Sequence, residues 1–376
     1  MTNLTEEKNL VRTIPPFRAD HVGSFLRPQR LKEARKAFSN QEITQTKLRA
    51  IENAEIIQLV EQQKATGIQS ITDGELRRSW WHIDFLEQLT GIEGYESETS
   101  YDFNGVKVRP YNIRVVGKVD FDPNHSFLED FKFLKEAVGS EGTAKQTIPS
   151  PNMLIHDGIR NEAIYPNIDD YFSDLAKTYQ KAIQAFYDVG CRYLQIDDTH
   201  WALLAAENKK ELFEKNGVDP IELAKRCAAT LNSALANKPA DLVVTMHVCR
   251  GNFASSWVYS GGYEKIAESL FSVTVDGFFL EYDNERSGDF SPLRHITRPD
   301  LQIVLGLVTS KEATLEDKSQ IKARIKEATE YVPLENLCLS PQCGFASTEE
   351  GNKISEEDQW AKLRHVVEIS EEVWGK

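Results

Sequence analysis

Residues 171–198 read YFSDLAKTYQKAIQAFYDVGCRYLQIDD and combine the period of a helix with that of a buried strand. In the first part, apolar residues recur every three or four positions, at Phe172, Leu175, Tyr179, Ile183 and Phe186. This spacing predicts a helix with one buried face. Gly190 interrupts the pattern, and the apolar run that follows leads directly to Asp197 and Asp198. A helix that feeds a short, fully buried strand is typical of a parallel sheet covered by helices.

The same unit of helix, small-residue stop, apolar run and polar residue occurs again in residues 48–75, 266–283 and 318–344. Further apolar runs lie at residues 18–24, 145–149, 242–248 and 302–307. Eight such units without a linker favour a (β/α)8 TIM barrel. An open, doubly wound sheet is the alternative, because strand order cannot be read from sequence. The alternating segment Tyr101–Phe121 predicts a β-hairpin inserted after the second strand.

The composition is that of a globular chain. Of its 376 residues, 40% are hydrophobic and 27% are charged, and the formal net charge is −14. This acidic balance argues against a nucleic-acid partner, which would require a basic surface. Residues 1–14 are polar and predict a loose N-terminal arm. Because no Pro-, Gly- or Ser-rich linker follows, we expect residues 15–376 to form one barrel.

The location of the protein is predicted from what the chain lacks. No apolar run is long enough to span a membrane, and the N-terminus has no signal-peptide pattern. The five cysteines are an odd number and are too scattered for a disulfide framework. Free thiols indicate a reducing compartment. We therefore expect a cytoplasmic protein without a membrane partner.

Polar side chains stand at the ends of the predicted strands, where barrel enzymes build their active sites. They are Ser24, Glu75, Asp197, Asp198, His247, Cys249, Glu281, Asp283 and Cys343. For each residue taken singly, the alternative is a helix cap or a loop anchor.

His247 and Cys249 form the most specific pair among these residues. Positions i and i+2 of an extended strand point to the same side, so both side chains can bind one ion. With Glu281 and Cys343 they make a donor set of nitrogen, sulfur and oxygen that suits Zn²⁺. The alternative is a small buried thiol beside a hydrogen-bonded histidine.

Six motifs, in order along nearly the whole chain, carry a family resemblance. They are Asp20-His-Val-Gly-Ser24-Phe, Asp73-Gly-Glu75, Tyr193-Leu-Gln-Ile-Asp197, His247-Val-Cys249, Phe278-Phe-Leu-Glu281 and Ser340-Pro-Gln-Cys343-Gly-Phe. Together they resemble the C-terminal barrel of cobalamin-independent methionine synthase. The resemblance implies a zinc ion held by His247, Cys249, Glu281 and Cys343, and homocysteine held by Ser24, Glu75 and Asp197. It implies an enzyme that moves a methyl group, from 5-methyltetrahydrofolate or a related donor, to the zinc-bound thiolate of homocysteine to give methionine.

The residues expected to bind the methyl donor depart from the family pattern. The chain has length for one barrel, whereas the full-length family enzyme has two. The pterin-stacking Trp of the family is absent from the segment 148–153 and from His156-Asp157 beyond it. Lys311 stands where longer relatives carry a His that is thought to donate a proton. The sequence leaves open the methyl donor, the proton donor, the oligomeric state and the need for a methyl-delivering partner protein.

Three alternatives to this function stay open. A related zinc-dependent alkyltransferase would act on another thiol, as epoxyalkane:coenzyme M transferases do. Glu75 and Asp197 favour a thiol that carries an ammonium group, because two carboxylates would repel a sulfonate. A Mg²⁺-dependent lyase or isomerase would use the oxygen ligands Asp197, Asp198, Glu281 and Asp283. A barrel that only binds a metabolite or a structural zinc is the non-enzyme alternative.

Some remaining polar residues have two interpretations. The adjacent Arg77 and Arg78 either contact an anionic group of a substrate, such as a polyglutamate tail, or belong to a loop packed by its tryptophans. The histidines at positions 125, 295 and 365 are expected to lie on the surface.

Overall fold

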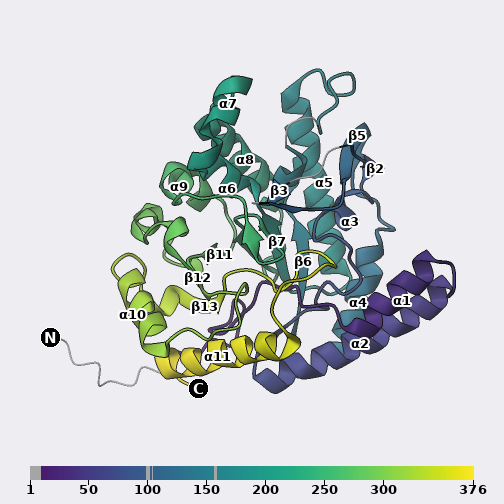
Figure 1. Cartoon of the computed structure of the whole chain (residues 1–376). Coiled ribbons are helices and arrows are strands. Elements are labelled where there is room, and N and C mark those ends of the chain that lie inside the picture. Colours follow the sequence, from purple (N-terminus) through teal and green to yellow (C-terminus); the bar gives the residue numbers. More distant parts are fainter. Residues whose placement is uncertain (1–9, 99–101, 104, 156–158) are drawn as a thin grey trace.

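A parallel sheet forms the centre of the computed structural model, which describes residues 10–98, 102–103, 105–155 and 159–376. Its strands are β1 (Ser70–Ile71), β6 (Thr143–Pro149), β7 (Tyr193–Asp198), β8 (Val243–Val248), β11 (Gly277–Glu281), β12 (Gln302–Val308) and β13 (Leu337–Pro341). They are hydrogen-bonded side by side in that order. Each strand therefore pairs with the next one along the chain, without the reversal that marks a doubly wound sheet. The sheet curls, and the predicted barrel architecture is confirmed (Figure 1).

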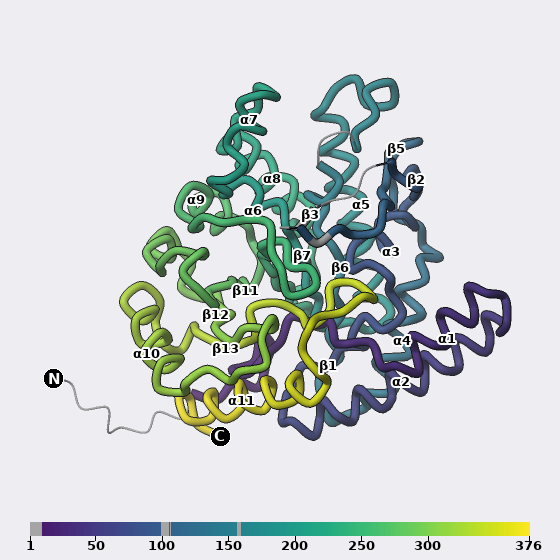
Figure 2. The backbone as a smooth tube through the Cα atoms, in the orientation of Figure 1, coloured from purple at the N-terminus to yellow at the C-terminus, as the bar shows by residue number. Residues whose placement is uncertain are grey.

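The segment of residues 18–24 stands in the place of the eighth strand. Ala19 makes one parallel bridge to Leu339 of β13. On the β1 side, side chains replace the backbone ladder: a ring nitrogen of His21 lies 2.8 Å from the carbonyl oxygen of Ser70. Figure 2 shows this purple N-terminal segment passing between β13 and β1. The predicted first strand is thus reduced to a single bridge, because side-chain hydrogen bonds take over its pairing.

One buried carboxylate ties this segment to three strands. The Asp20 carboxylate accepts hydrogen bonds from Ser70 Oγ of β1 at 2.7 Å, Lys145 Nζ of β6 at 3.1 Å and Tyr193 Oη of β7 at 2.9 Å. The side chains of Asp20 and Lys145 are both 0% exposed. A buried ion pair needs such additional hydrogen bonds to offset its loss of water.

Replacement of Lys145 by methionine should destabilise the fold by about 3–5 kcal/mol, because it leaves the Asp20 carboxylate buried without its cation. Urea denaturation followed by circular dichroism would measure this loss as a lower midpoint. The matched control is Lys132→Met, which removes the exposed partner of Glu129. That change should cost less than about 1 kcal/mol. Equal effects of the two substitutions would contradict the structural role given to the buried pair.

Helices pack around the sheet (Figure 1). The α-helices are α1 (Gln29–Ser39), α2 (Gln45–Thr66), α3 (Ile83–Leu86), α4 (Ser126–Val138), α5 (Ile168–Asp188), α6 (His200–Ala205), α7 (Lys210–Asn216), α8 (Pro220–Leu235), α9 (Ala267–Phe271), α10 (Lys318–Ala328) and α11 (Glu356–Trp374). Short 3-10 helices cover Pro151–Leu154, Glu207–Lys209, Glu264–Ile266, Glu285–Ser287, Ser291–His295 and Leu334–Asn336. No helix in the described part of the chain is long and apolar enough to cross a membrane.

The segment 171–198 folds as its periodicity predicts. The apolar face of α5 is buried. The helix ends at Asp188, and Gly190, two residues later, has a φ of 96°. All six residues of β7 are buried. The strand is buried on both faces because α5 and its neighbours cover the sheet on the outside, while other side chains fill its inner face.

An inserted hairpin follows β1, as expected. Strand β2 (Thr90–Glu96) pairs antiparallel with β5 (Tyr111–Asp120), and β3 (Asp102–Phe103) pairs with β4 (Val106–Lys107). The predicted segment Tyr101–Phe121 contains three of these strands but not β2, and Tyr101 lies outside the described residues. Strand β2 escaped prediction because only one of its residues is buried, so it has no alternating pattern.

The expectation of surface histidines is wrong at two of three positions. His125 is 2% exposed and His365 is 6% exposed. His125 precedes α4, where its side chain accepts a hydrogen bond from the Phe127 backbone. His365 contacts the Glu316 carbonyl oxygen at 2.8 Å. Both rings have backbone hydrogen-bond partners that the sequence pattern does not show.

Candidate active site

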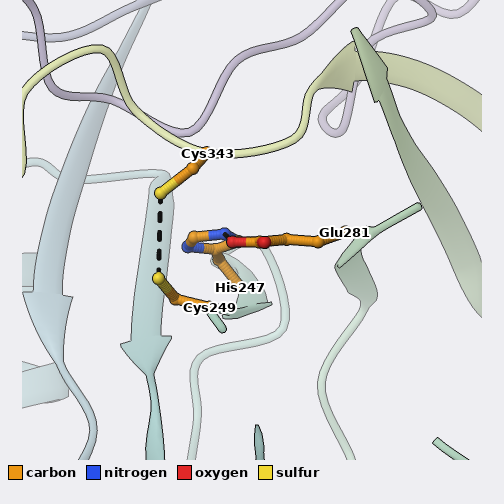
Figure 3. A group of neighbouring side chains, drawn as sticks. All are labelled: His247, Cys249, Glu281 and Cys343. Atoms are coloured by element: carbon orange, nitrogen blue, oxygen red, sulfur yellow. Dashed lines mark hydrogen bonds and ion pairs between the residues drawn. The ribbon is translucent and has the colours of Figure 1, made fainter. Parts of the chain in front are cut away.

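Four side chains from three strands converge at one end of the sheet. His247 belongs to β8 and Cys249 follows it directly, Glu281 is the last residue of β11, and Cys343 lies just beyond β13. One potential ligand atom from each residue lies within 4.8 Å of the others, and all four residues are buried. Figure 3 shows the four side chains pointing toward a common centre. Within the described ranges of the chain, this is the group of His, Cys, Asp and Glu side chains that could hold a metal ion.

The distances within this cluster fit a tetrahedral cation. The two sulfur atoms are 3.7 Å apart, far beyond the roughly 2.05 Å of a disulfide bond. Zinc–sulfur bonds of about 2.3 Å at tetrahedral angles would place two sulfur ligands about 3.8 Å apart. His247 Nε2 and Glu281 Oε1 are also 3.7 Å apart. These two spacings are close to those around one small tetrahedral ion, and all four ligand atoms lie within 4.8 Å of one another.

Asp197 of β7 orients the imidazole ring of His247. Its Oδ1 lies 3.1 Å from His247 Nδ1, and it also accepts a hydrogen bond from Gln195 Nε2 at 2.8 Å. When Nδ1 donates to a carboxylate, Nε2 presents its lone pair to an ion. Nε2 is the nitrogen that faces Glu281. This arrangement of carboxylate, imidazole and ion is common in protein metal sites.

The electrostatics of the cluster favour a cation. Burial opposes ionisation of Glu281, but His247, Arg286 and Lys311 lower the pKa of its carboxyl group to about 2. A hydrogen bond from Cys343 lowers the pKa of the Cys249 thiol, and the same bond raises the pKa of Cys343. Although burial opposes it, hydrogen bonds to Asp197 and Glu281 raise the pKa of His247 to about 10. Anionic groups thus surround the imidazole, and a metal ion can replace the proton that they attract.

Glu281 has protein partners besides the cluster. Its Oε1 accepts hydrogen bonds from Asn252 Nδ2 at 2.6 Å and from the Arg250 backbone at 3.2 Å, and its Oε2 accepts one from Arg286 at 3.2 Å. Asn252 also lies 3.4 Å from the sulfur of Cys249. Asn252 opens the small hairpin of β9 (Asn252–Phe253) and β10 (Ser256–Trp257). The sequence did not predict a role for Asn252. The only sign of one is its position, three residues after Cys249.

Replacement of Asn252 by alanine should weaken binding of a divalent cation about 10- to 100-fold, because such outer partners hold the ligands in place. Competition with a fluorescent chelator would measure the affinity. Asn232→Ala is the matched control, since its amide donates to the Ser272 carbonyl far along the chain. An unchanged affinity in the Asn252 variant would exclude a role for its amide in orienting Glu281 and Cys249.

Glu75 is a buried carboxylate with one uncommitted oxygen. It follows Gly74 after β1, has a φ of 58° and is 4% exposed. Its Oε1 accepts a hydrogen bond from Thr147 at 2.8 Å and pairs with Arg78 at 3.2 Å, whereas its buried Oε2 has no hydrogen-bond partner among the described residues. Burial raises the pKa of Glu75. The charge of Arg78 lowers this pKa, and the charge of Asp197 raises it further. The free oxygen can accept a hydrogen bond from a bound cationic group.

Ser24 packs against the loop that carries Cys343. Its hydroxyl lies 3.4 Å from the Ala346 backbone nitrogen, and its carbonyl accepts a hydrogen bond from Phe345 at 2.9 Å. Gly344 makes this approach possible, because a Cβ there would stand 2.0 Å from Ser24 Oγ. The structure thus places Ser24 beside the cluster and Asp197 in contact with it, while Asp197 also acts electrostatically on Glu75.

The remaining polar residues at the strand ends have other partners. Asp198 Oδ1 accepts hydrogen bonds from the His200 and Trp201 backbones at the start of α6, which is the capping alternative. Asp283 pairs with Lys311 Nζ at 2.6 Å. The four oxygen ligands of the magnesium alternative do not form a possible metal-binding group among the described residues.

Comparison with known proteins identifies the family of the chain. The sequence profile described as "Cobalamin-independent synthase, Catalytic domain" matches residues 17–372. The uncharacterized protein YxjG of Bacillus subtilis (strain 168) is 53% identical over 375 residues, which cover 99% of each chain. A methionine synthase of Sulfolobus acidocaldarius is 25% identical over 324 residues, which cover 86% of this chain and 84% of that one.

Solved structures agree with this match. A protein from Listeria monocytogenes, provisionally assigned as a vitamin-B12-independent methionine synthase, has a crystal structure with a TM-score of 0.80 at 50% identity, covering 97% of this chain and 100% of that one. The B12-independent methionine synthase from Shewanella sp. W3-18-1, in complex with selenomethionine, has the same fold, with a TM-score of 0.67 at 18% identity and coverage of 94% and 96%. Since the profile spans nearly all of the residues that build the barrel and its four-residue cluster, the chain belongs to the catalytic-domain family of the cobalamin-independent methionine synthases.

Proposed function

We propose that the protein is a zinc-dependent methyltransferase that converts homocysteine to methionine, with a methyl-folate or a related compound as donor. The observation that carries the proposal is the meeting of His247, Cys249, Glu281 and Cys343 around one point, with a partly unbound carboxylate on Glu75 beyond them. Two thiolates, an imidazole and a carboxylate form a donor set that suits zinc better than magnesium.

A bound zinc ion would supply a positive charge that deprotonates a coordinated thiol at neutral pH, where a free alkyl thiol of pKa about 8.5 is mostly protonated. The surrounding residues exclude water, since all four proposed ligands are buried. A thiolate without its water shell is better prepared to attack a methyl group.

The polar residues around the cluster are suited to hold the amino-acid part of homocysteine. The unbound oxygen of Glu75 and the carboxylate of Asp197 offer a favourable place for the ammonium group. Ser24 is suited to the substrate carboxylate, because its hydroxyl can donate a hydrogen bond. A charged hydrogen bond in a buried site is worth more than a neutral one, so these contacts favour an amino-acid thiol.

Glu281 is suited to more than one arrangement during turnover. Its carboxylate accepts hydrogen bonds from Asn252, Arg286 and the Arg250 backbone, which can hold it when it is not bound to a cation. A catalytic zinc site must keep or free one position for substrate. These partners support a ligand that can shift without becoming an isolated buried charge.

The second candidate is a zinc-dependent alkyltransferase acting on another thiol. A thiol with only a sulfonate, such as coenzyme M, would bring its negative charge next to Glu75 and Asp197. The buried position of Glu75 makes that repulsion costly, because low polarity strengthens interactions between charges. The observations therefore favour homocysteine. Residues His156 and Asp157, on the proposed donor side, lie outside the described residues.

A donor screen with fixed acceptor tests the proposal. The purified protein would first be analysed for metal content, with one zinc per chain expected. It would then receive homocysteine with mono- and polyglutamyl methyl-folates, methylcobalamin or S-methylated donors, and methionine would be the readout. A parallel series would replace homocysteine by coenzyme M. Stoichiometric magnesium, or alkylation of coenzyme M but never of homocysteine, would refute the proposed function.

A further inference from the structure

The hairpin of β9 and β10 lies at the mouth of the barrel, beside the candidate metal site. It follows β8, at whose end Cys249 lies, and its tip contacts the connection between β13 and α11, which carries Cys343. Strands β11 and β12 lie between β8 and β13 in the sheet. The hairpin and this connection therefore meet across the carboxyl ends of the strands, where a barrel admits its substrates.

Hydrogen bonds between the hairpin tip and this connection form what we call the latch. The backbone N–H of Ser255 donates to Asn352 Oδ1 at 2.7 Å, and the Lys353 backbone N–H donates to the Ser255 hydroxyl at 3.1 Å. Asn352 Nδ2 in turn donates to the Ser310 carbonyl oxygen, in the loop after β12, at 3.1 Å. Each of these bonds uses a side-chain atom, so the latch can open without disturbing the backbone ladder of the central sheet.

The turn at the tip of the hairpin is strained. Ala254 and Ser255 have φ angles of 46° and 65°. Two-residue hairpin turns require this left-handed backbone, and for that reason they prefer Asn and Gly. A residue with a Cβ atom adopts the left-handed backbone at a cost in free energy. The latch offsets this cost in the closed hairpin, so loss of the latch favours opening.

The residues around the cluster are closed off from solvent. Ser24, Glu75 and Asp197, which we assign to homocysteine, are 6%, 4% and 6% exposed. Asn252 of the hairpin contacts two of the four clustered residues and is itself partly exposed. One hairpin residue therefore lies between these two proposed ligands and solvent. Movement of the hairpin would open a route to the cluster for a thiol of amino-acid size.

We propose that the β9–β10 hairpin is a lid over the cluster, which opens when the latch breaks, admits the thiol substrate and closes over it. Asn352 is a positioning residue of this lid, because it acts through the hairpin and not on the substrate. Closure of such a lid excludes water from the reacting groups. The identity of the entering thiol rests on the proposed function, whereas the lid itself rests on the contacts of the hairpin.

The rate at which zinc leaves the loaded, full-length protein tests the lid without requiring catalysis. Transfer of zinc to the coloured chelator 4-(2-pyridylazo)resorcinol would be followed by stopped-flow absorbance. Asn352→Ala removes two bonds of the latch and should speed this transfer about 5- to 30-fold, as expected for the loss of two neutral hydrogen bonds. The equilibrium affinity for zinc should not change, because a lid that opens more often speeds the entry and the release of the ion equally.

The matched control is Asn336→Ala. Asn336 is 8% exposed, and its amide donates to the carbonyl oxygens of Pro299 and Leu301 at 2.8 and 2.9 Å. These contacts lie just before β12 and β13, at the end of the sheet opposite the cluster. The control variant should release zinc at the wild-type rate. Ala254→Gly relaxes the left-handed turn and should slow the release, which is the opposite effect to that of Asn352→Ala.

The outcomes separate the lid from the proposed function. Equal release rates in the Asn352 and Asn336 variants, or faster release from Ala254→Gly, would overturn the lid while leaving methyl transfer intact. A zinc affinity that fell by as much as the release rate rose would also overturn it, because Asn352 would then hold the ligands in place and not control access to them. If the rates behave as expected but no donor yields methionine, the proposed function is refuted and the lid stands.

Discussion

Replacement of Cys249 by serine should abolish stoichiometric zinc binding and reduce methionine formation more than 100-fold. A serine hydroxyl is a harder and much less acidic donor than a thiol, so it replaces a thiolate ligand poorly. Loss of an outer partner of a ligand already costs about 10- to 100-fold in metal affinity or activity, and loss of the ligand itself should cost more. Elemental analysis of the purified variant would be combined with the methionine assay.

The matched control for this substitution is Cys227→Ala. Cys227 is also a fully buried free thiol, but it lies in α8 and outside the cluster. Its variant should keep one zinc per chain and near-normal activity. If the Cys249 variant retained full zinc content while the fold stayed intact, the four-residue cluster would not be the metal site.

The second large effect is expected from Glu75→Gln, which keeps the shape of the side chain and removes its charge. The catalytic efficiency kcat/KM for homocysteine should fall about 10- to 150-fold, because a hydrogen bond to a charged group is worth about 1.5–3 kcal/mol. Zinc content should not change, since Glu75 is not one of the four clustered residues.

A substrate analogue sharpens this test. 4-Mercaptobutyrate lacks the ammonium group of homocysteine but keeps its thiol and carboxylate. The wild type should prefer homocysteine strongly, whereas Glu75→Gln should use the two thiols with similar efficiency. A variant that loses activity equally toward both compounds would show that Glu75 does not recognise the ammonium group.

The same substitution should stabilise the fold at alkaline pH. Because burial raises the pKa of Glu75 above its ordinary value, the folded state holds a proton more tightly than the unfolded state does. The folded protein therefore loses stability as the pH rises through that raised pKa. Glu75→Gln removes this loss, so its gain in the unfolding midpoint should be largest near pH 8 and should shrink on acidification. A gain that grew toward low pH would contradict the direction of the shift.

Much of the fold follows from the sequence pattern. The helical spacing before Gly190 and the apolar run after it correspond to α5 and β7, because both elements bury continuous apolar surface. The pattern was less informative where burial was slight. Strand β2 has one buried residue. The segment of residues 18–24 makes one bridge and is otherwise held by side-chain hydrogen bonds, among them those of Asp20 and His21.

The candidate site, like the fold, could be predicted from the sequence only in part. Residue spacing on strands predicts that His247 and Cys249 share a face, and the order of motifs links them with Glu281 and Cys343. The uncommitted oxygen of Glu75 and the amide of Asn252 beside Glu281 depend on contacts between distant segments. Such contacts leave no periodic pattern in the sequence. Residue spacing could not separate the capping Asp198 from the histidine partner Asp197, since both end the same strand, and only the family motif singled out Asp197.

The amino-acid sequence alone favoured the barrel over an open sheet and gave the chemical identity of the proposed ligands, because apolar periodicity and residue type are local properties of the chain. The folded arrangement was needed to learn which donors meet within 4.8 Å and which carboxylate keeps a free oxygen. These properties depend on distances between residues that are tens to hundreds of positions apart, and those distances exist only after parallel strands bring their carboxyl ends together.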